Sequence, residues 1–158
     1  MSNVKAVPEG YRSLTPYLFI KGAAAAIEFY KNVFGATERM RMPGADGRIM
    51  HAELQIGDSI LMLADENPKM GALSPQTIGG SGGLVNVYVA DVDGAIAKAV
   101  ALGANVVRPV KDQFYGDRTG GIVDPFGHIW SVATHVEDVS PEEMQKRAAI
   151  AMSQSAGA

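Results

Sequence analysis

The sequence predicts an α+β fold of two βαβββ modules, with curved mixed sheets around a cavity and a helix after the second module. The first observation is an internal repeat: residues 14–36 and 83–104 both run from an alternating strand pattern through a turn into an amphipathic helix that ends at Gly-Ala. The second is a later pair, residues 56–65 and 126–135, which align at a similar offset of about 70 residues. The third is a stretch rich in Gly, Pro and Ser between the two copies, which is typical of a linker.

These patterns divide the chain into five segments. We expect an N-terminal arm, a first module, a linker, a second module, and a C-terminal helix with a frayed tail, which cover residues 1–13, 14–65, 66–83, 84–136 and 137–158 respectively. The linker lacks the preceding strand, the following helix and the lysine of a phosphate-binding loop, so its glycines do not indicate a nucleotide site.

In the first module, Thr15–Ile20 alternates and is rich in strand-forming residues, which predicts a strand. Gly22–Phe34 carries apolar residues at helical spacing, and Gly35 is suited to end that helix. After it, we expect three strands, the last two joined at Gly57-Asp58: Glu38–Met42, Met50–Ile56 and Ser59–Ala64.

The second module repeats this order. We expect a strand, a helix and three further strands at Val85–Val89, Val92–Leu102, Asn105–Val110, Gly121–Val123 and Ile129–Thr134. Ser140, Pro141 and Glu143 then indicate a helix start, because serine caps a helix, proline fits its first turn and glutamate completes a capping box. The helical pattern continues through Met144–Met152.

Composition limits the functions of the chain. Its 14 Lys and Arg and 17 Asp and Glu give a net charge of −3 without a long basic run, so we expect no nucleic-acid partner. No apolar stretch approaches the roughly 20 residues that span a bilayer, and the N-terminus lacks the apolar core of a signal peptide. We therefore expect a cytoplasmic protein without a membrane partner. Because there is no cysteine, a metal would need His, Asp or Glu, and the chain has three histidines: His51, His128 and His135.

Several stretches carry a family resemblance. IEFYKNVFGA and DPFGHIWSVATH resemble the first helix and the final hairpin of the glyoxalase/bleomycin-resistance/dioxygenase (vicinal-oxygen-chelate) superfamily. HAEL, FYGDR and ATHVEDVSPEEM are similar to its PhnB-like bacterial branch. The resemblance covers residues 14–136 and implies paired modules, and a homodimer whose sheets complete each other, with or without exchanged modules. This fold carries lyases, dioxygenases, epimerases, thiol transferases and drug binders, so the function has to be argued from the site.

The resemblance also implies where a metal would be bound. Metal enzymes of the superfamily place one ligand near the start of the first strand of each module and another on the last strand. Carried over to this chain, the four positions are Thr15, Leu61, Leu84 and Ser131. None offers an imidazole or a carboxylate, so we expect no metal and no other cofactor.

Strand alternation predicts the side chains that line the cavity. We expect a partly aromatic, partly polar lining made of Thr15, Tyr17, Phe19, His51, Glu53, Asn86, Tyr88 and Ser131. Residues 113–118 form a predicted loop over the cavity, where Gln113, Tyr115 and Arg118 are candidate ligand contacts. Arg118 is suited to bind a carboxylate or phosphate; the simpler alternative is a salt bridge to Asp117 or Asp124.

The favoured hypothesis is a binding or resistance-type protein that holds a small organic molecule in a metal-free cavity. The alternative is a metal-independent isomerase or lyase-type enzyme with Glu53 or His51 as the base, since these side chains lie two apart on a strand and point the same way. The simpler interpretation of this pair is a solvated or hydrogen-bonded pair at the edge of the sheet. A metal-dependent lyase or dioxygenase is less favoured. We expect His128 to cap the hairpin and His135 to be exposed.

Overall fold

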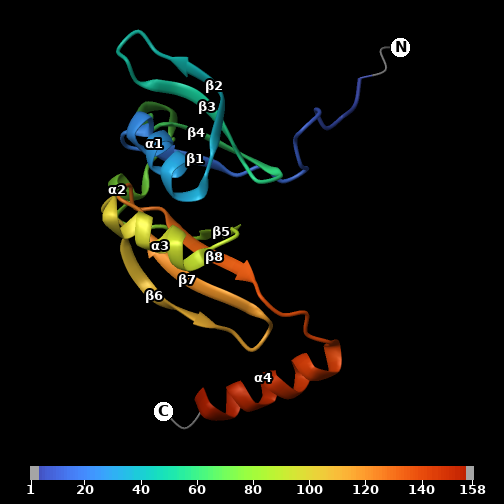
Figure 1. Ribbon diagram of the computed structural model, residues 1–158. Coiled ribbons are helices and arrows are strands. Elements are labelled where there is room, and N and C mark those ends of the chain that lie inside the picture. The colour runs from blue at the N-terminus through green and yellow to red at the C-terminus, as the bar shows by residue number, and fades with distance from the viewer. Residues whose placement is uncertain (1–3, 156–158) are drawn as a thin grey trace.

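The computed structural model describes residues 4–155 and contains two four-stranded sheets (Figure 1). The first module comprises β1 (Tyr17–Ile20), α1 (Ala23–Phe34), β2 (Thr37–Pro43), β3 (Ile49–Ile56) and β4 (Ser59–Asp65). The second comprises β5 (Leu84–Tyr88), α3 (Val92–Ala101), β6 (Asn105–Asp112), β7 (Asp117–Val123) and β8 (Ile129–His135). Two short helices, η1 (Pro68–Met70) and α2 (Pro75–Ile78), lie between the modules, and α4 (Pro141–Ser155) follows them. The predicted α+β fold with a repeated βαβββ order is confirmed.

Both sheets have the same topology. Their strand orders are β1-β4-β3-β2 and β5-β8-β7-β6, and the first strand of each module pairs in parallel with the last. The other pairs are antiparallel. The first strand of each module therefore lies at one edge of its sheet, and the second strand lies at the other edge.

The two modules share one core on the helix sides of their sheets. The helices α1 and α3 contact each other, and buried apolar residues from both modules form one cluster (Figure 1). Trp130 of β8 packs on Phe34 and Tyr30 of α1, with ring centroids 4.7 and 5.1 Å apart. The buried Asp124 carboxylate accepts hydrogen bonds from the Tyr30 hydroxyl at 2.7 Å and the Trp130 indole at 2.9 Å. Because the helix faces meet, neither module covers the opposite face of the other module's sheet; we call these two surfaces the open faces.

Several element boundaries differ from the sequence-based expectation. Strand β7 begins at Asp117 rather than Gly121, since Asp117–Gly120 pair with β8. The helix α4 begins at Pro141, with Ser140 Oγ accepting from the Glu143 amide at 3.3 Å, and continues beyond Met152 to Ser155. The last part of the tail expected to fray, residues 156–158, lies outside the described residues. No helix within residues 4–155 is both long and apolar enough to cross a bilayer.

Candidate functional site

The open face of the first sheet carries the aromatic and acidic side chains expected in the cavity. Tyr17 of β1 lies across from Met62 of β4, Met62 across from Glu53 of β3, and Glu53 across from Met40 of β2. Phe19 lies two residues after Tyr17 on the same face, and their rings are 5.4 Å apart. Tyr17, Phe19 and Met40 are exposed. This face therefore combines apolar surface with one carboxylate.

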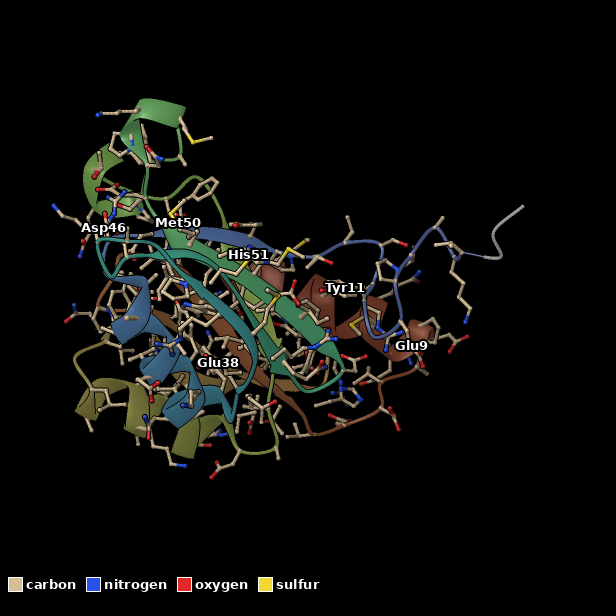
Figure 2. All side chains as sticks on the ribbon, turned by 90° about the horizontal axis from the view of Figure 1, so that it is seen from above. Glu9, Tyr11, Glu38, Asp46, Met50 and His51 are labelled. Carbon is tan, nitrogen blue, oxygen red and sulfur yellow. The ribbon has the colours of Figure 1, made fainter. Side chains whose placement is uncertain are left out.

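A hydrogen-bonded network surrounds that carboxylate. The Tyr11 hydroxyl donates to Glu53 Oε2 at 2.5 Å, and His51 Nε2 lies 3.2 Å from Glu53 Oε1. The other ring nitrogen of His51 lies 2.8 Å from the Tyr17 hydroxyl. Figure 2 shows His51 on the outer side of the sheet and Tyr11 on the N-terminal arm. Sequence reasoning missed Tyr11, because residues outside the repeat have no position that a strand pattern can assign.

The network decides the charge of Glu53. Burial raises the pKa of this carboxyl, but the hydrogen bonds from Tyr11 and His51, with the charge of Arg39 nearby, outweigh burial and lower the pKa overall. The Tyr11 hydroxyl has a raised pKa because it donates to Glu53. Glu53 is therefore an ionised carboxylate with both oxygens engaged, which makes it a weak proton acceptor. The contacts agree with a hydrogen-bonded pair, but its expected place at the edge of the sheet is wrong, because β3 is an inner strand and Glu53 is buried.

The open face of the second sheet presents a different set of side chains. Asn86 of β5 lies across from Ser131 of β8, which lies across from Gly121 of β7. Leu84 and Tyr88, on either side of Asn86 along β5, are 52% and 61% exposed. This face therefore places polar groups beside exposed apolar and aromatic surface.

A second network lies at the end of this face. The Tyr88 hydroxyl donates to Asp117 Oδ2 at 2.7 Å, and His135 Nδ1 lies 2.7 Å from Asp117 Oδ1. His135 Nε2 lies 2.9 Å from Asp138 Oδ1. Burial raises the pKa of Asp117, but bonds from His135 and Tyr88 lower it by more, whereas bonds to Asp117 and Asp138 raise the pKa of His135. His135 is exposed as expected, and its ring is bonded at both nitrogens. The sequence pattern places Asp117 in a loop and so does not predict this pairing.

Arg118 does not lie over the open face. It belongs to β7, and its guanidinium pairs with Asp93 of α3 at 2.7 and 2.9 Å and with Asp112 at 3.0 Å. These carboxylates raise its pKa. The ligand contact considered for Arg118 is therefore not supported by its position, and its ion-pair partners are not the Asp117 or Asp124 that the alternative named.

The other two loop candidates lie in different places. The side-chain amide of Gln113 donates to Thr119 Oγ1 at 2.9 Å, and Thr119 is on the open face because it pairs with Ala133. Tyr115 is half-exposed and packs edge-on against Phe114. Gln113 thus reaches the open face, and Tyr115 lies on the loop beyond it.

The positions implied for metal ligands do not fit a metal ion. Leu61 is buried in the core on the helix side of the first sheet, so its assignment to the cavity face is wrong; Met62 lies there instead, across from Tyr17. Thr15 donates to the Arg12 carbonyl at 3.1 Å. With Leu84 and Ser131, these positions offer hydroxyl, thioether and alkyl groups, which are not a donor set for a divalent transition metal. Within residues 4–155, no three His, Asp or Glu side chains come together as potential ligands.

His128 has a contact between the modules. Its backbone amide donates to Asp124 Oδ1 at 2.9 Å inside the turn, as expected of a hairpin position. Its Nε2 lies 3.0 Å from the carbonyl oxygen of Phe19, which belongs to the other module. His128 therefore joins the last hairpin to β1.

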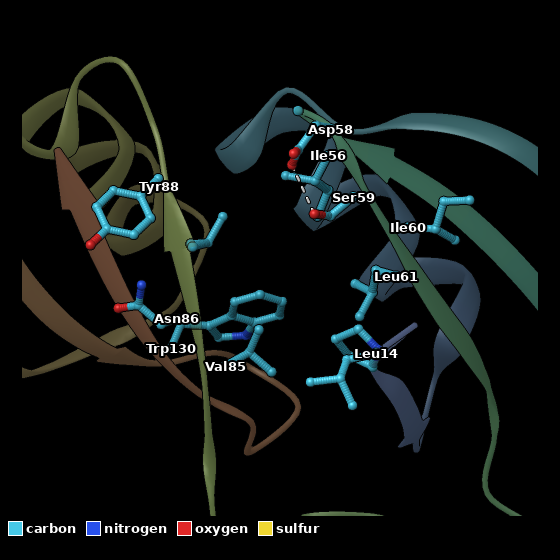
Figure 3. A pocket seen from close by; sticks show the side chains of 13 residues that line it. Leu14, Ile56, Asp58, Ser59, Ile60, Leu61, Val85, Asn86, Tyr88 and Trp130 are labelled. Carbon is cyan, nitrogen blue, oxygen red and sulfur yellow. Dashed lines mark hydrogen bonds between the residues drawn. The ribbon is translucent and has the colours of Figure 1, made fainter. Parts of the chain in front are cut away.

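Two hollows are formed by a single chain, one between the modules on the helix side of the sheets and one beside the open face of the first sheet. A cleft of about 320 Å³ separates the modules and is lined mostly by apolar groups from Leu14, Pro16, Ile56–Leu61, Val85–Tyr88 and Trp130. In Figure 3, Val85 and Trp130 point into this cleft, whereas the side chains of Asn86 and Tyr88 lie on the other side of β5. A second hollow of about 310 Å³ lies beside Tyr17 and Phe19, with Met50, Asn67 and Met70 among its lining residues. The side chains expected to line one cavity are thus on separate surfaces of the single chain.

Comparisons with known proteins give one consistent result. The sequence model described as Glyoxalase/Bleomycin resistance protein/Dioxygenase superfamily matches residues 13–132. An uncharacterised protein of Mycobacterium tuberculosis H37Rv is 40% identical over 136 residues, which cover 84% of this chain and 80% of that protein. The crystal structure of TioX from Micromonospora sp. ML1 has 31% identity and a TM-score of 0.60, covering 79% of this chain and 99% of TioX. A PhnB protein from Bacillus cereus shares the fold, with a TM-score of 0.61 and 17% identity over 78% of this chain and 99% of that one.

Proposed function

The chain belongs to the glyoxalase/bleomycin resistance protein/dioxygenase superfamily, and from this premise we propose that it is a binding protein of the resistance type. It holds a small, partly aromatic organic molecule in a cavity without a metal. The observation that carries the proposal is the pair of open sheet faces, where large apolar side chains such as Tyr17, Phe19 and Leu84 are exposed beside a few polar groups. Such a mixture suits a ligand with an apolar body and a small number of hydrogen-bonding groups.

The proposal includes a homodimer. In each sheet the first strand of the module, β1 or β5, is an edge strand whose outer side has no neighbouring strand within residues 4–155. An edge strand favours pairing with another chain. A second copy that sets its second sheet opposite the first sheet of its partner covers both open faces and encloses a cavity between them. Exchanged modules are one way to reach this arrangement, and the cytoplasm is its proposed location.

The metal-independent enzyme ranks second. It requires Glu53 or His51 to accept a proton from a substrate, but both Glu53 oxygens and both His51 ring nitrogens already have partners in the protein. The lowered pKa of Glu53 also weakens it as a base. Binding without turnover requires neither group to be free.

Thermal unfolding of the purified protein with a panel of aromatic and heterocyclic compounds tests the proposal. A ligand at a hundred times its dissociation constant adds about 2.7 kcal/mol to the free energy of unfolding, which raises Tm by roughly 5–10 °C for a chain of this size. We expect at least one compound class to do so in buffer that contains a chelator. The proposal fails if stabilisation or turnover requires an added divalent metal.

A further inference from the structure

Three polar side chains lie in one cross-strand row on the open face of the second sheet. Asn86 pairs in register with Ser131, Ser131 with Gly121, and Gly121 with Arg108 of β6. Among the residues that the structure describes, the side chains of Asn86, Ser131 and Arg108 have no hydrogen-bond or ion-pair partner. Nearby polar side chains do have partners, since Asp117 accepts from Tyr88 and contacts His135. The row is therefore a set of hydrogen-bonding groups left available to another molecule.

Arg108 can lie flat against the sheet because Gly121, its partner on β7, has no side chain. A Cβ atom built on Gly121 would lie 2.7 Å from Arg108 Nε and 3.2 Å from Nη2. Any larger residue would displace the guanidinium from the strand. Charged residues on edge strands such as β6 also help to prevent association between sheets. Arg108 in addition lies across the neighbouring strand at Gly121, which pairs in register with Ser131.

The electrostatic surroundings leave this guanidinium without a counter-ion. Asp117 is the carboxylate on the same face of β7, and its two oxygens already accept from Tyr88 and His135. Lys111, which pairs in register with Thr119, adds a second exposed cation, also without a partner among the described residues. The row is thus rich in donors and positively charged, which is the environment that carboxylate, sulfonate and phosphate groups require.

We propose that Arg108, Ser131 and Asn86 bind an anionic group of the ligand, while its apolar body lies on Leu84 and Tyr88. The inference rests on the proposed function and adds the chemical class of the ligand: an aromatic or heterocyclic oxyanion. Leu84 and Tyr88 flank Asn86 on β5, so one molecule can contact the apolar surface and the polar row together. Arg108 is a residue that sequence reasoning missed, because an edge-strand arginine has no motif around it.

Two fluorescent probes with the same apolar body test the inference. 8-Anilino-1-naphthalenesulfonate carries a sulfonate, and N-phenyl-1-naphthylamine is the same molecule without it. Fluorescence titration gives the dissociation constant of each for the wild type, for Arg108→Gln and for a control, Lys98→Gln. Lys98 is an exposed cation on α3, on the opposite side of the same sheet, so the control removes the same charge from the same module.

For the wild type and for Lys98→Gln, we expect the sulfonate probe to bind roughly tenfold more tightly than the neutral probe. In Arg108→Gln, the two probes should bind about equally, with the affinity for the neutral probe unchanged. A sulfonate preference that persists in Arg108→Gln, or that falls equally in Lys98→Gln, overturns the anion site and leaves the proposed function standing. The same holds if the wild type binds both probes equally. If neither probe binds the wild type, both proposals fail.

Discussion

Replacement of Asp124 tests how strongly the two modules are joined through their shared core. The open faces depend on this core, because it holds the helix sides of the two sheets together. The carboxylate lies in the turn between β7 and β8 and is 3% exposed. Its Oδ2 accepts from the Tyr30 hydroxyl and the Trp130 indole, and its Oδ1 accepts from the amides of Phe126 and His128. Tyr30 belongs to the first module and the other partners belong to the second. One buried group therefore joins both halves of the core.

The size of the effect follows from the donors that lose their acceptor. In Asp124→Ala, the buried hydroxyl of Tyr30 and the buried indole NH of Trp130 are left unpaired, and each unpaired donor costs about 1–3 kcal/mol. The two amides are only partly buried, so water replaces much of what they lose. We expect the free energy of unfolding to fall by about 2–6 kcal/mol. In Asp124→Asn, the amide oxygen keeps two donors and the Tyr30 hydroxyl can rotate to accept from the new NH2 group. Tyr30 then keeps one hydrogen bond, and Trp130 alone loses its partner entirely, so we expect about half that loss.

Equilibrium unfolding in urea gives these differences directly. Tyr30→Phe is the matched control, because it removes a donor together with its hydrogen bond and leaves no donor unpaired; we expect a loss of about 1–2 kcal/mol. The order of destabilisation should be Asp124→Ala, then Asp124→Asn, then Tyr30→Phe. If Asp124→Ala unfolds within 0.5 kcal/mol of the wild type, a value roughly equal to the scatter of neutral surface changes, the two modules do not share the core described above.

Three further changes test the sites. Glu53→Gln should retain binding of the aromatic probes. The free energy of unfolding should fall by about 1–3 kcal/mol, because the new NH2 group faces hydrogen-bond donors from which the carboxylate accepted. If the variant instead loses turnover of a substrate that the wild type converts, the enzyme hypothesis is favoured. The bonds to Asp117 and Asp138 raise the pKa of His135 above its ordinary value of 6.5, so its stabilising contribution is complete below that pH and declines as pH rises through the raised pKa. The difference in unfolding free energy between the wild type and His135→Asn should therefore shrink towards pH 9. A difference that grows with pH would contradict the ion pairing of His135. Gly120→Ala should destabilise the fold by about 1–3 kcal/mol, because its Cβ would collide with a buried side chain of α3, whereas Gly80→Ala meets no neighbour within 4 Å and should change little; equal melting temperatures for the two variants would contradict this packing.

Local patterns were enough to predict the repeated architecture. Each helix begins or ends at residues whose chemistry acts within a few positions, as in Ser140, which caps α4, and Gly35, which ends α1 with φ of 65° and donates to the Tyr30 carbonyl. Strand alternation also identified Tyr17 and Asn86 as residues of the open faces, because a two-residue period follows from the backbone alone.

The misassigned face of Leu61 has a specific cause. Alignment of the two final hairpins by sequence gives an offset of 70 residues, whereas the observed pairing relates both the first and the last strands of the modules by 69 residues, Tyr17 to Asn86 and Met62 to Ser131. A shift of one residue moves a side chain to the opposite face of a strand. The observed register places Met62 rather than Leu61 across from Tyr17. A repeat seen in sequence fixes the order of the strands more firmly than the faces of individual side chains.

Long-range pairing explains the remaining differences. The sequence does not indicate that Arg118 pairs with Asp93, since the two are 25 residues apart and the sequence pattern predicts a later start for β7. That later start came from Gly120 and Gly121, which weaken a strand pattern. In the folded chain these glycines admit a side chain of α3 on one face of β7 and Arg108 on the other. Contacts that depend on a missing side chain leave no signal in the hydrophobic pattern.

Native mass spectrometry of the purified protein, with and without the sulfonate probe, tests the central claim most directly, because one spectrum reports oligomeric state, bound metal and bound organic molecule. We expect a dimer of 16.7 kDa subunits with no stoichiometric metal, which takes up one probe molecule for each subunit. A divalent ion that remains bound to every subunit, or a monomer that takes up no probe, would contradict a metal-free binding cavity between two copies of the chain.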